Sequence, residues 1–127
     1  MNAHHDAHGA RGARPDARPA GEVTALSETG QRLPAEAVPA SSGRAARTVV
    51  ALPGLRATLL APAEGRAPAG HRAPGPATLL CLAGRVTLST AGRAWTLGRN
   101  DLVPVPEERH RLDAGTDALV LLTVRPD

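Results

Sequence analysis

The sequence predicts an all-β fold, a sandwich or small barrel, over residues 48–127, and three observations support this prediction. Leu and Val number twenty-one in this region but only four in residues 1–47. Apolar and polar residues alternate there with a period of two, which is typical of strands with one buried face. The expected strands are short, and Gly, Pro, Asn or Asp interrupts them about every 8–12 positions. This spacing argues against the longer β-α-β repeat of a parallel sheet.

Each expected strand ends at a turn signal such as Pro53-Gly54 or Ala91-Gly92. A long loop rich in Pro and Gly covers residues 62–76. The third strand is apolar on both faces, which predicts a buried position inside a sheet. An open sheet of about 80 residues would expose long edges, so closure into two facing sheets or a barrel is expected. The eight expected strands cover residues 48–52, 55–60, 78–82, 86–89, 95–97, 102–105, 110–113 and 118–124.

The first third of the chain has a different character. Residues 1–22 contain mainly Ala, Arg, Gly, Pro, Asp and His in low-complexity order, and we predict that they are disordered. Residues 23–47 are expected to form a short helix and a linker. The helix is expected around residues 24–32 and is predicted to stop early because Pro34 and Pro39 follow. The whole segment has too few large apolar residues to bury a core alone.

Composition and charge exclude several classes of function. All fifteen basic residues are Arg, they are spread thinly, and one Trp is the only aromatic residue, so a nucleic-acid-binding surface is not expected. The longest apolar run, residues 118–122, is far shorter than the roughly 20 residues of a membrane span. No apolar stretch follows the N-terminus, so no secretory signal peptide is expected. The single cysteine, Cys81, fits a reducing cytoplasm. These features predict a soluble, cytoplasmic, single-domain protein.

Three consecutive stretches, residues 65–84, 85–97 and 98–124, carry a family resemblance. They contain, in order, a loop His, a Leu-rich strand ending in Gly, a hairpin, a Gly-x-x-Asp turn, an apolar strand running into Pro, a His and the final strand LVLLTV. In this order and spacing the chain resembles a short single-domain bacterial cupin from about residue 41 to residue 124. The resemblance implies a small double-stranded β-helix, or jelly-roll barrel. Such barrels are usually dimeric and carry a site inside the barrel mouth.

The first metal-binding motif of that family is only partly present. Its pattern is Gly, five residues, His-x-His, three or four residues, Glu, six residues and Gly. Gly65, His71 and Gly84 match this pattern. Ala73 stands where the second His would be, and Ala77 where the Glu would be. The resemblance therefore leaves His71 as the one metal ligand of this motif.

The second motif is also incomplete. Pro106 matches, whereas Asn100 and Glu108 replace two Gly residues. Arg111 stands where the ligand His would be, and His110 precedes it by one residue. At most two of the four usual ligands, His71 and His110, therefore remain. Tight binding of a first-row metal generally needs three or four protein ligands. The resemblance thus implies a degenerate site, with at most a weakly bound divalent metal such as Fe, Mn, Ni or Zn.

His110 is the strongest candidate site residue on the evidence of strand alternation. It shares parity with Leu112 and is predicted to point into the barrel, while Arg111 and Asp113 face solvent. An inward His can ligate a metal, bind a substrate carboxylate or act as an acid or base near neutral pH. The alternative interpretation is a hydrogen-bonded histidine at the barrel rim that only orders residues 106–109.

His71 lies in the Pro/Gly loop, where alternation says nothing about its direction, and the jelly-roll fold implies a position near the barrel mouth. One alternative remains, a weak metal site of His71 and His110 that Glu64, Glu107 or Glu108 completes. Such Glu residues are more often solvated loop charges.

Two further residues, Trp95 and Cys81, each have a structural and a functional interpretation. Trp95 is expected to pack in the core or a dimer interface, with lining of a ligand pocket as the alternative. Cys81 lies in the most apolar strand, where burial would raise the pKa of its thiol and make it inert rather than nucleophilic.

Two functional hypotheses follow. The first is a cupin that binds a small molecule, or acts as a structural or sensing module, with a degenerate metal site and with His71, Trp95 and His110 near the ligand. The second is a metal-dependent cupin enzyme of the dioxygenase or isomerase type that uses His71 and His110. The missing Glu and second His favour the first. A homodimer through the edge strand 48–52 is also expected, because a core of Leu, Val and Ala in about 80 residues is small.

Overall fold

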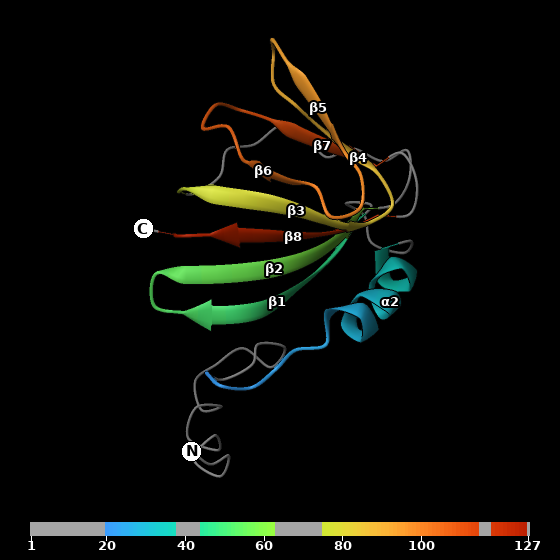
Figure 1. Cartoon of the computed structure of the whole chain (residues 1–127), viewed down its shortest axis with the longest axis vertical. Coiled ribbons are helices and arrows are strands. Elements are labelled where there is room, and N and C mark those ends of the chain that lie inside the picture. Colours follow the sequence, from blue (N-terminus) through green and yellow to red (C-terminus); the bar gives the residue numbers. More distant parts are fainter. Residues whose placement is uncertain (1–19, 38–43, 63–74, 115–117, 127) are drawn as a thin grey trace.

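The computed structural model describes residues 20–37, 44–62, 75–114 and 118–126, which contain one helix and eight strands. All strand pairs are antiparallel, so the all-β prediction is confirmed. One sheet has five strands in the order β1-β2-β8-β3-β6, and the other has three in the order β5-β4-β7 (Figure 1). The elements are α2 (Leu26–Ala37), β1 (Arg44–Leu52), β2 (Leu55–Pro62), β3 (Ala77–Ala83), β4 (Val86–Ser89), β5 (Ala94–Leu97), β6 (Leu102–Pro104), β7 (Arg111–Ala114) and β8 (Leu119–Val124).

The strands agree with the predicted positions to within a few residues, and the largest difference is at the start of β1. This strand begins at Arg44 rather than at Thr48. Its first residues pair with the end of β2, from Arg44 opposite Pro62 to Arg47 opposite Leu59. Strand pairing depends on the partner as much as on the residues themselves. Pairing with β2 therefore extends β1 into a segment whose own sequence suggests a linker.

The predicted stop of the helix at Pro34 is wrong, because α2 continues to Ala37. A proline inside a helix lacks an N–H group and crowds the carbonyl four residues earlier, which costs about 3 kcal/mol. Tertiary packing offsets this cost. Leu33 is completely buried against the sheet, and Gly30 has no side chain to keep the helix away from Leu119. Packing of an apolar helix face commonly outweighs local propensity.

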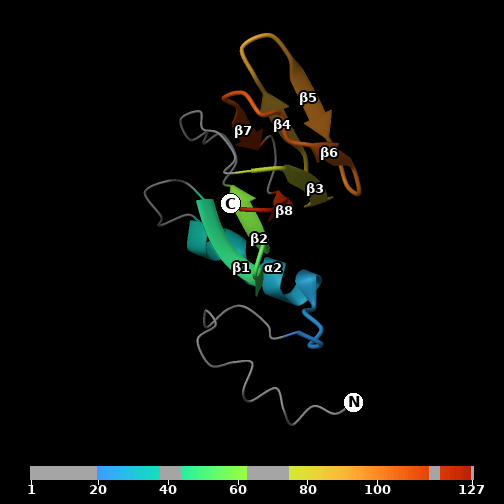
Figure 2. The same cartoon turned by 90° about the vertical axis from the view of Figure 1, so that its left-hand side faces the viewer.

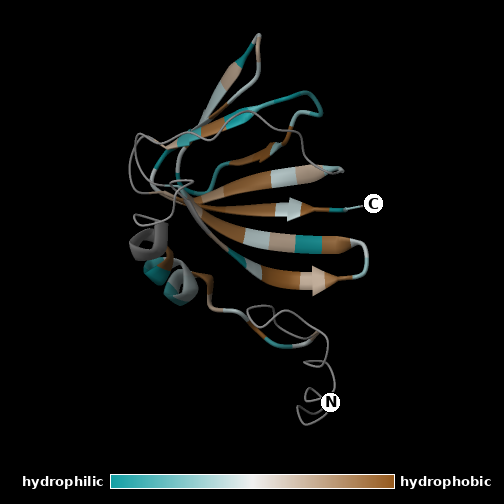
Figure 3. Ribbon diagram, turned by 180° about the vertical axis from the view of Figure 1, so that it is seen from behind, coloured by the Kyte–Doolittle hydropathy of each residue, from teal (hydrophilic) through white to brown (hydrophobic). Residues whose placement is uncertain are grey.

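Buried apolar side chains lie on both faces of the five-stranded sheet and form two cores. Its inner face packs against β4, β5 and β7, whereas α2 covers β1 and β2 on its outer face (Figure 2). Brown, hydrophobic segments run along the strands of this sheet in Figure 3. In β3, Leu79 and Cys81 belong to the inner core and Leu82 packs on the outer one. The inner core contains Leu60, Leu79, Cys81, Val86, Leu88, Leu97, Leu112, Ala114, Ala118 and Val120, and the outer core Leu33, Val49, Ala57, Leu59 and Ala61.

Most of the predicted disordered tail and of the predicted linker lies outside the residues that the structure describes. Of the tail predicted to be disordered, residues 1–19 lie outside the described residues, as do the predicted linker residues 41–43. Residues 20–22 are described and exposed, and they lead into the helix. No helix in the described part of the chain is long and apolar enough to cross a membrane.

Candidate ligand-binding site

His110 lies directly before β7 and is 6% exposed. Leu112 and Ala114, which share its parity, are buried in the inner core. The side chains of Arg111 and Asp113 are 54% and 41% exposed, and they form an ion pair of 3.1 Å on the outside. The predicted alternation along this strand is therefore confirmed, and His110 lies on the inward-facing side.

A backbone contact sets the protonation pattern of the His110 ring. Its Nδ1 atom lies 3.1 Å from the carbonyl oxygen of Glu108. A carbonyl oxygen can only accept a hydrogen bond, so Nδ1 carries the proton. In the neutral ring the lone pair is then on Nε2, which is the nitrogen that can accept a proton or bind a cation. The same contact ties the ring to the loop before β7, as the rim interpretation expects.

Strand register brings two other polar residues beside His110. The pairing of β4 with β7 ends with Ser89 opposite Arg111. Thr90, which follows Ser89, and His110, which precedes Arg111, line the same hollow. On the other side of β4, the Thr90 N–H donates to the carbonyl of Arg93 at 2.8 Å, which closes the β4–β5 hairpin. Arg93, Thr90 and His110 therefore form one row at the adjacent ends of β5, β4 and β7.

The next row of this sheet is apolar and belongs to the inner core. Register sets Trp95 and Leu112 on either side of Leu88. Trp95 is half-buried against the core, and the Arg93 guanidinium carbon lies 4.8 Å from its ring centroid. This is cation–π geometry. It combines a positive charge and an aromatic face at the edge of the inner core.

A hollow of about 270 Å³ opens beside His110. Its wall includes Thr90, Ala91 and Arg109, at the end of the β4–β5 hairpin that extends beyond the five-stranded sheet (Figure 1). The hollow is small, and it is accessible from solvent at the row of polar residues.

The described residues supply few metal ligands at this site. Glu107 and Glu108 are exposed, and Glu108 contacts His110 through its carbonyl rather than its carboxylate. His71 and Glu64 lie outside the described residues. Within the described part of the chain, no three His, Cys, Asp or Glu side chains gather where they could hold a metal ion. The described residues thus offer one imidazole, fewer than the three or four ligands of a tight mononuclear site.

Cys81 is completely buried in the inner core. Burial raises the pKa of its thiol, the charge of Asp101 raises this pKa further, and the hydrogen bond with the Ala83 backbone acts in the opposite direction. The raised pKa predicted from the apolar strand is confirmed, and it argues against a nucleophilic role.

Sequence reasoning did not identify Thr90 and Arg93 as site residues. The signal was present, because the Ala91-Gly92 turn makes Thr90 and Arg93 the last pair of the hairpin. Strand alternation from Leu88 and Trp95 then sets both on the inward face. What the sequence did not contain was the pairing of β4 with β7, which brings the ends of these strands together so that Thr90 and His110 line one hollow.

Comparison with known proteins supports the fold and leaves the chemistry open. No family model matches the sequence, and no curated protein matches it significantly. Solved structures do match. An RmlC-like cupin from Shewanella frigidimarina aligns at 17% identity over 68% of this chain and 79% of its own, with a TM-score of 0.61. A conserved protein of unknown function from Streptococcus pyogenes aligns at 21% identity over 69% and 78%, with a TM-score of 0.60.

A third match is to a much longer protein. A mutant of salicylate 1,2-dioxygenase from Pseudoaminobacter salicylatoxidans aligns at 21% identity, with a TM-score of 0.68. The alignment covers 77% of this chain but only 34% of the dioxygenase. At these identities the likeness establishes fold alone. The chain therefore has the cupin jelly-roll fold that its sequence resembles, which confirms that prediction.

Proposed function

We propose that this protein is a small-molecule-binding jelly-roll barrel with a degenerate metal site, and that its ligand is a small carboxylate with a planar or apolar body. The observation that carries the proposal is the row of Arg93, Thr90 and His110: Thr90 and His110 line one hollow, and Arg93, bonded to Thr90, lies over the Trp95 ring. The proposal includes no nucleic-acid partner, and it includes a cytoplasmic location because the single cysteine cannot form an internal disulfide.

The chemistry of this row suits a carboxylate. A guanidinium and a hydroxyl donate hydrogen bonds, and the imidazole can add a donor when it is protonated. The indole of Trp95 offers an apolar surface for the body of the ligand. The similar fold of a salicylate dioxygenase supports the choice of an aromatic carboxylate as the first compound to test.

The metal motifs support the degenerate site. Ala73 and Ala77 have no metal-binding groups, and they occupy two positions where the cupin pattern has ligands. Arg111 occupies a third, and its guanidinium is paired with Asp113 outside the barrel. The proposal therefore predicts ligand binding that does not depend on a metal.

The test is a calorimetric titration of the full chain with salicylate, with and without EDTA. Loss of one charge-assisted hydrogen bond costs about 1.5–3 kcal/mol, so Arg93→Gln should weaken binding by at least about tenfold, and His110→Ala should also weaken it. Arg85→Gln removes an exposed charge outside the row and is the matched control. Binding that is abolished by EDTA, or that is equal in Arg93→Gln and Arg85→Gln, would refute the proposal.

A metal-dependent enzyme of the dioxygenase or isomerase type is the alternative, and the tautomer of His110 favours it. With Nδ1 held by the Glu108 carbonyl, Nε2 is in the form that histidine ligands use. In that case His71 would be the second ligand. About one equivalent of Fe, Mn, Ni or Zn in the purified chain, lost in both His71→Ala and His110→Ala, would establish this alternative. Less than about a tenth of an equivalent would reject it.

The proposal extends to a homodimer through β1. β1 is an edge strand of the five-stranded sheet, and Leu52 at its end is exposed. An exposed edge offers unpaired backbone groups to a second copy of the chain. Light scattering should give the mass of a dimer at tens of micromolar, and a monomer mass would reject this part of the proposal.

A further inference from the structure

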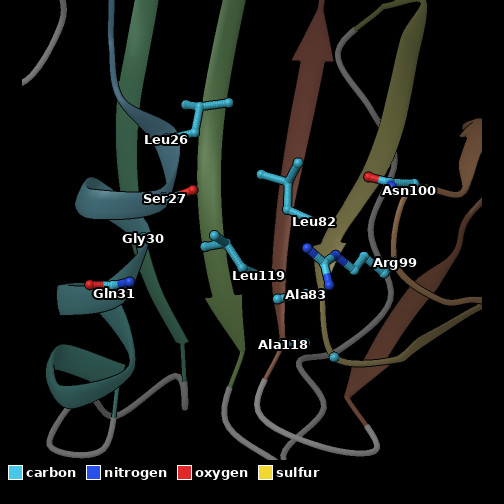
Figure 4. Close-up of a pocket in the computed structure, with 11 residues that line it drawn as sticks. Leu26, Ser27, Gly30, Gln31, Leu82, Ala83, Arg99, Asn100, Ala118 and Leu119 are labelled. Carbon is cyan, nitrogen blue, oxygen red and sulfur yellow. The ribbon is translucent and has the colours of Figure 1, made fainter.

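A second cavity lies away from the candidate site, on the outer side of the five-stranded sheet (Figure 4). It has a volume of about 680 Å³ and lies between α2 and the ends of β3 and β8. Ligand cavities in proteins typically measure about 300–1,000 Å³. The five-stranded sheet separates this cavity from the row of Arg93, Thr90 and His110.

The floor of the cavity is apolar. Leu82 and Leu119 line it from the sheet, and Leu26 lines it from the helix. All three are only partly buried, so they retain surface that a ligand could cover. Gly30 lines the cavity too, and a side chain there would overlap Leu119. The floor can therefore receive an apolar chain or ring.

Within the described part of the chain, the rim carries one charge, and that charge is positive. Ser27 and Gln31 line the helix side, and Arg99 with Asn100 lines the opposite side. None of the described residues brings a carboxylate to the lining. Among the described residues, no side chain forms an ion pair with Arg99. Figure 4 shows the Arg99 side chain extending from its turn toward the ends of the strands that form the floor.

The turn that carries Arg99 is held on both sides by hydrogen bonds. The Gly98 N–H donates to the Asp101 carboxylate at 2.8 Å, and the Asp101 N–H donates to the Gly98 carbonyl at 3.0 Å. Backbone bonds of 2.7 and 2.9 Å tie Asn100 and Asp101 to Cys81 in β3. Asn100 adopts a φ of 70°, which a turn of this kind requires. The backbone that carries the cation is therefore fixed before a ligand binds, so only the Arg99 side chain has to be ordered.

From this combination we infer that the cavity is a second ligand site, for an amphipathic carboxylate whose apolar body lies between α2 and the sheet and whose charge meets Arg99. Charge complementarity sets the sign of the ligand, since a guanidinium is the only charged group that the described residues place on the lining. The apolar floor selects against a fully polar anion such as inorganic phosphate. This inference does not depend on the proposed function of the barrel site, because the two sites share no residue.

The test is an NMR titration of the full chain with decanoate, with decanol as the neutral probe. Decanoate should bind saturably below about 1 mM and shift the amide signals of Leu82, Leu119 and Asn100. Arg99→Gln should weaken binding by about fivefold, the value for a partly exposed charge pair of about 1 kcal/mol. Decanol should bind the wild-type chain more weakly than decanoate by a similar factor.

Two variants complete the design. Ala83→Phe fills the cavity from an exposed position on its lining and should abolish the shifts, while Arg56→Gln removes a charge from β2 outside the cavity and should leave them unchanged. Equal binding of decanoate and decanol, equal binding by Arg99→Gln and Arg56→Gln, or retained shifts in Ala83→Phe would each overturn the inference. If Ala83→Phe kept the decanoate shifts but had a lower mass by light scattering than the wild-type chain, the cavity would be a contact with a second copy of the chain. That result would also overturn the inference.

Discussion

Replacement of Leu33 by Ala removes the completely buried side chain that docks α2 on the outer face of the five-stranded sheet. The variant lacks three carbon groups, each worth about 0.8 kcal/mol of transfer free energy, or about 2.4 kcal/mol in total. The cavity left against Val49 and Leu59 adds about 1 kcal/mol. We therefore expect the free energy of unfolding to fall by about 3–4 kcal/mol, a large part of the stability of a domain of this size.

Urea denaturation followed by circular dichroism measures this loss, with Leu55→Ala as the matched control. Leu55 is 41% exposed at the start of β2, so its truncation should cost less than about 1 kcal/mol. The reasoning assumes that α2 unfolds together with the barrel. If Leu33→Ala lost no more stability than Leu55→Ala, the helix would not belong to the cooperative fold, and the wall of the outer cavity would be lost with it.

Three other residues give predictions with a defined sign. The folded chain keeps the Cys81 proton that the unfolded chain releases above about pH 8.5, so the free energy of unfolding should decrease as pH rises through that value. The chain has no Lys or Tyr to titrate there, so Cys81→Val should flatten the decrease measured by urea denaturation. An equal decrease with pH in the wild-type chain and in Cys81→Val would contradict the prediction. Asn100→Ala should cost about 1–2 kcal/mol in thermal unfolding because of its φ of 70°, while Asn100→Gly should not; equal melting temperatures would show that the turn relaxes. Gly30→Ala should gain less than the stability of about 1 kcal/mol that helix propensity alone predicts, because the new methyl group displaces the Leu119 side chain, so the full gain in thermal unfolding would reject the packing argument.

The sequence was most informative where a local rule decides the structure. Alternation predicted β4 at its observed bounds, and the parity of Leu112 predicted that His110 is buried while Arg111 is exposed. These predictions hold because a strand with one buried face must repeat every two residues. The motif positions also showed directly that Ala73 and Ala77 cannot ligate a metal.

The site was predicted only in part, because its other members depend on pairing between distant strands. Thr90 and His110 line one hollow because β4 pairs with β7, which no local pattern encodes. The contact of Arg93 with Trp95 was within reach of hairpin reasoning, since the two residues share one face of β5. The position of His71 relative to these residues stays a prediction.

By itself the sequence determined the all-β class, the order and approximate bounds of the strands, the incomplete metal motifs and the burial of Cys81. Tertiary structure decided that α2 continues through Pro34, that the five-stranded sheet is covered on its outer face, and that Arg99 borders a cavity between helix and sheet. The physical reason is the range of the interactions. Alternation and turn chemistry act over a few residues, whereas docking of Leu33 and the close approach of Gly30 to Leu119 join segments far apart in the chain.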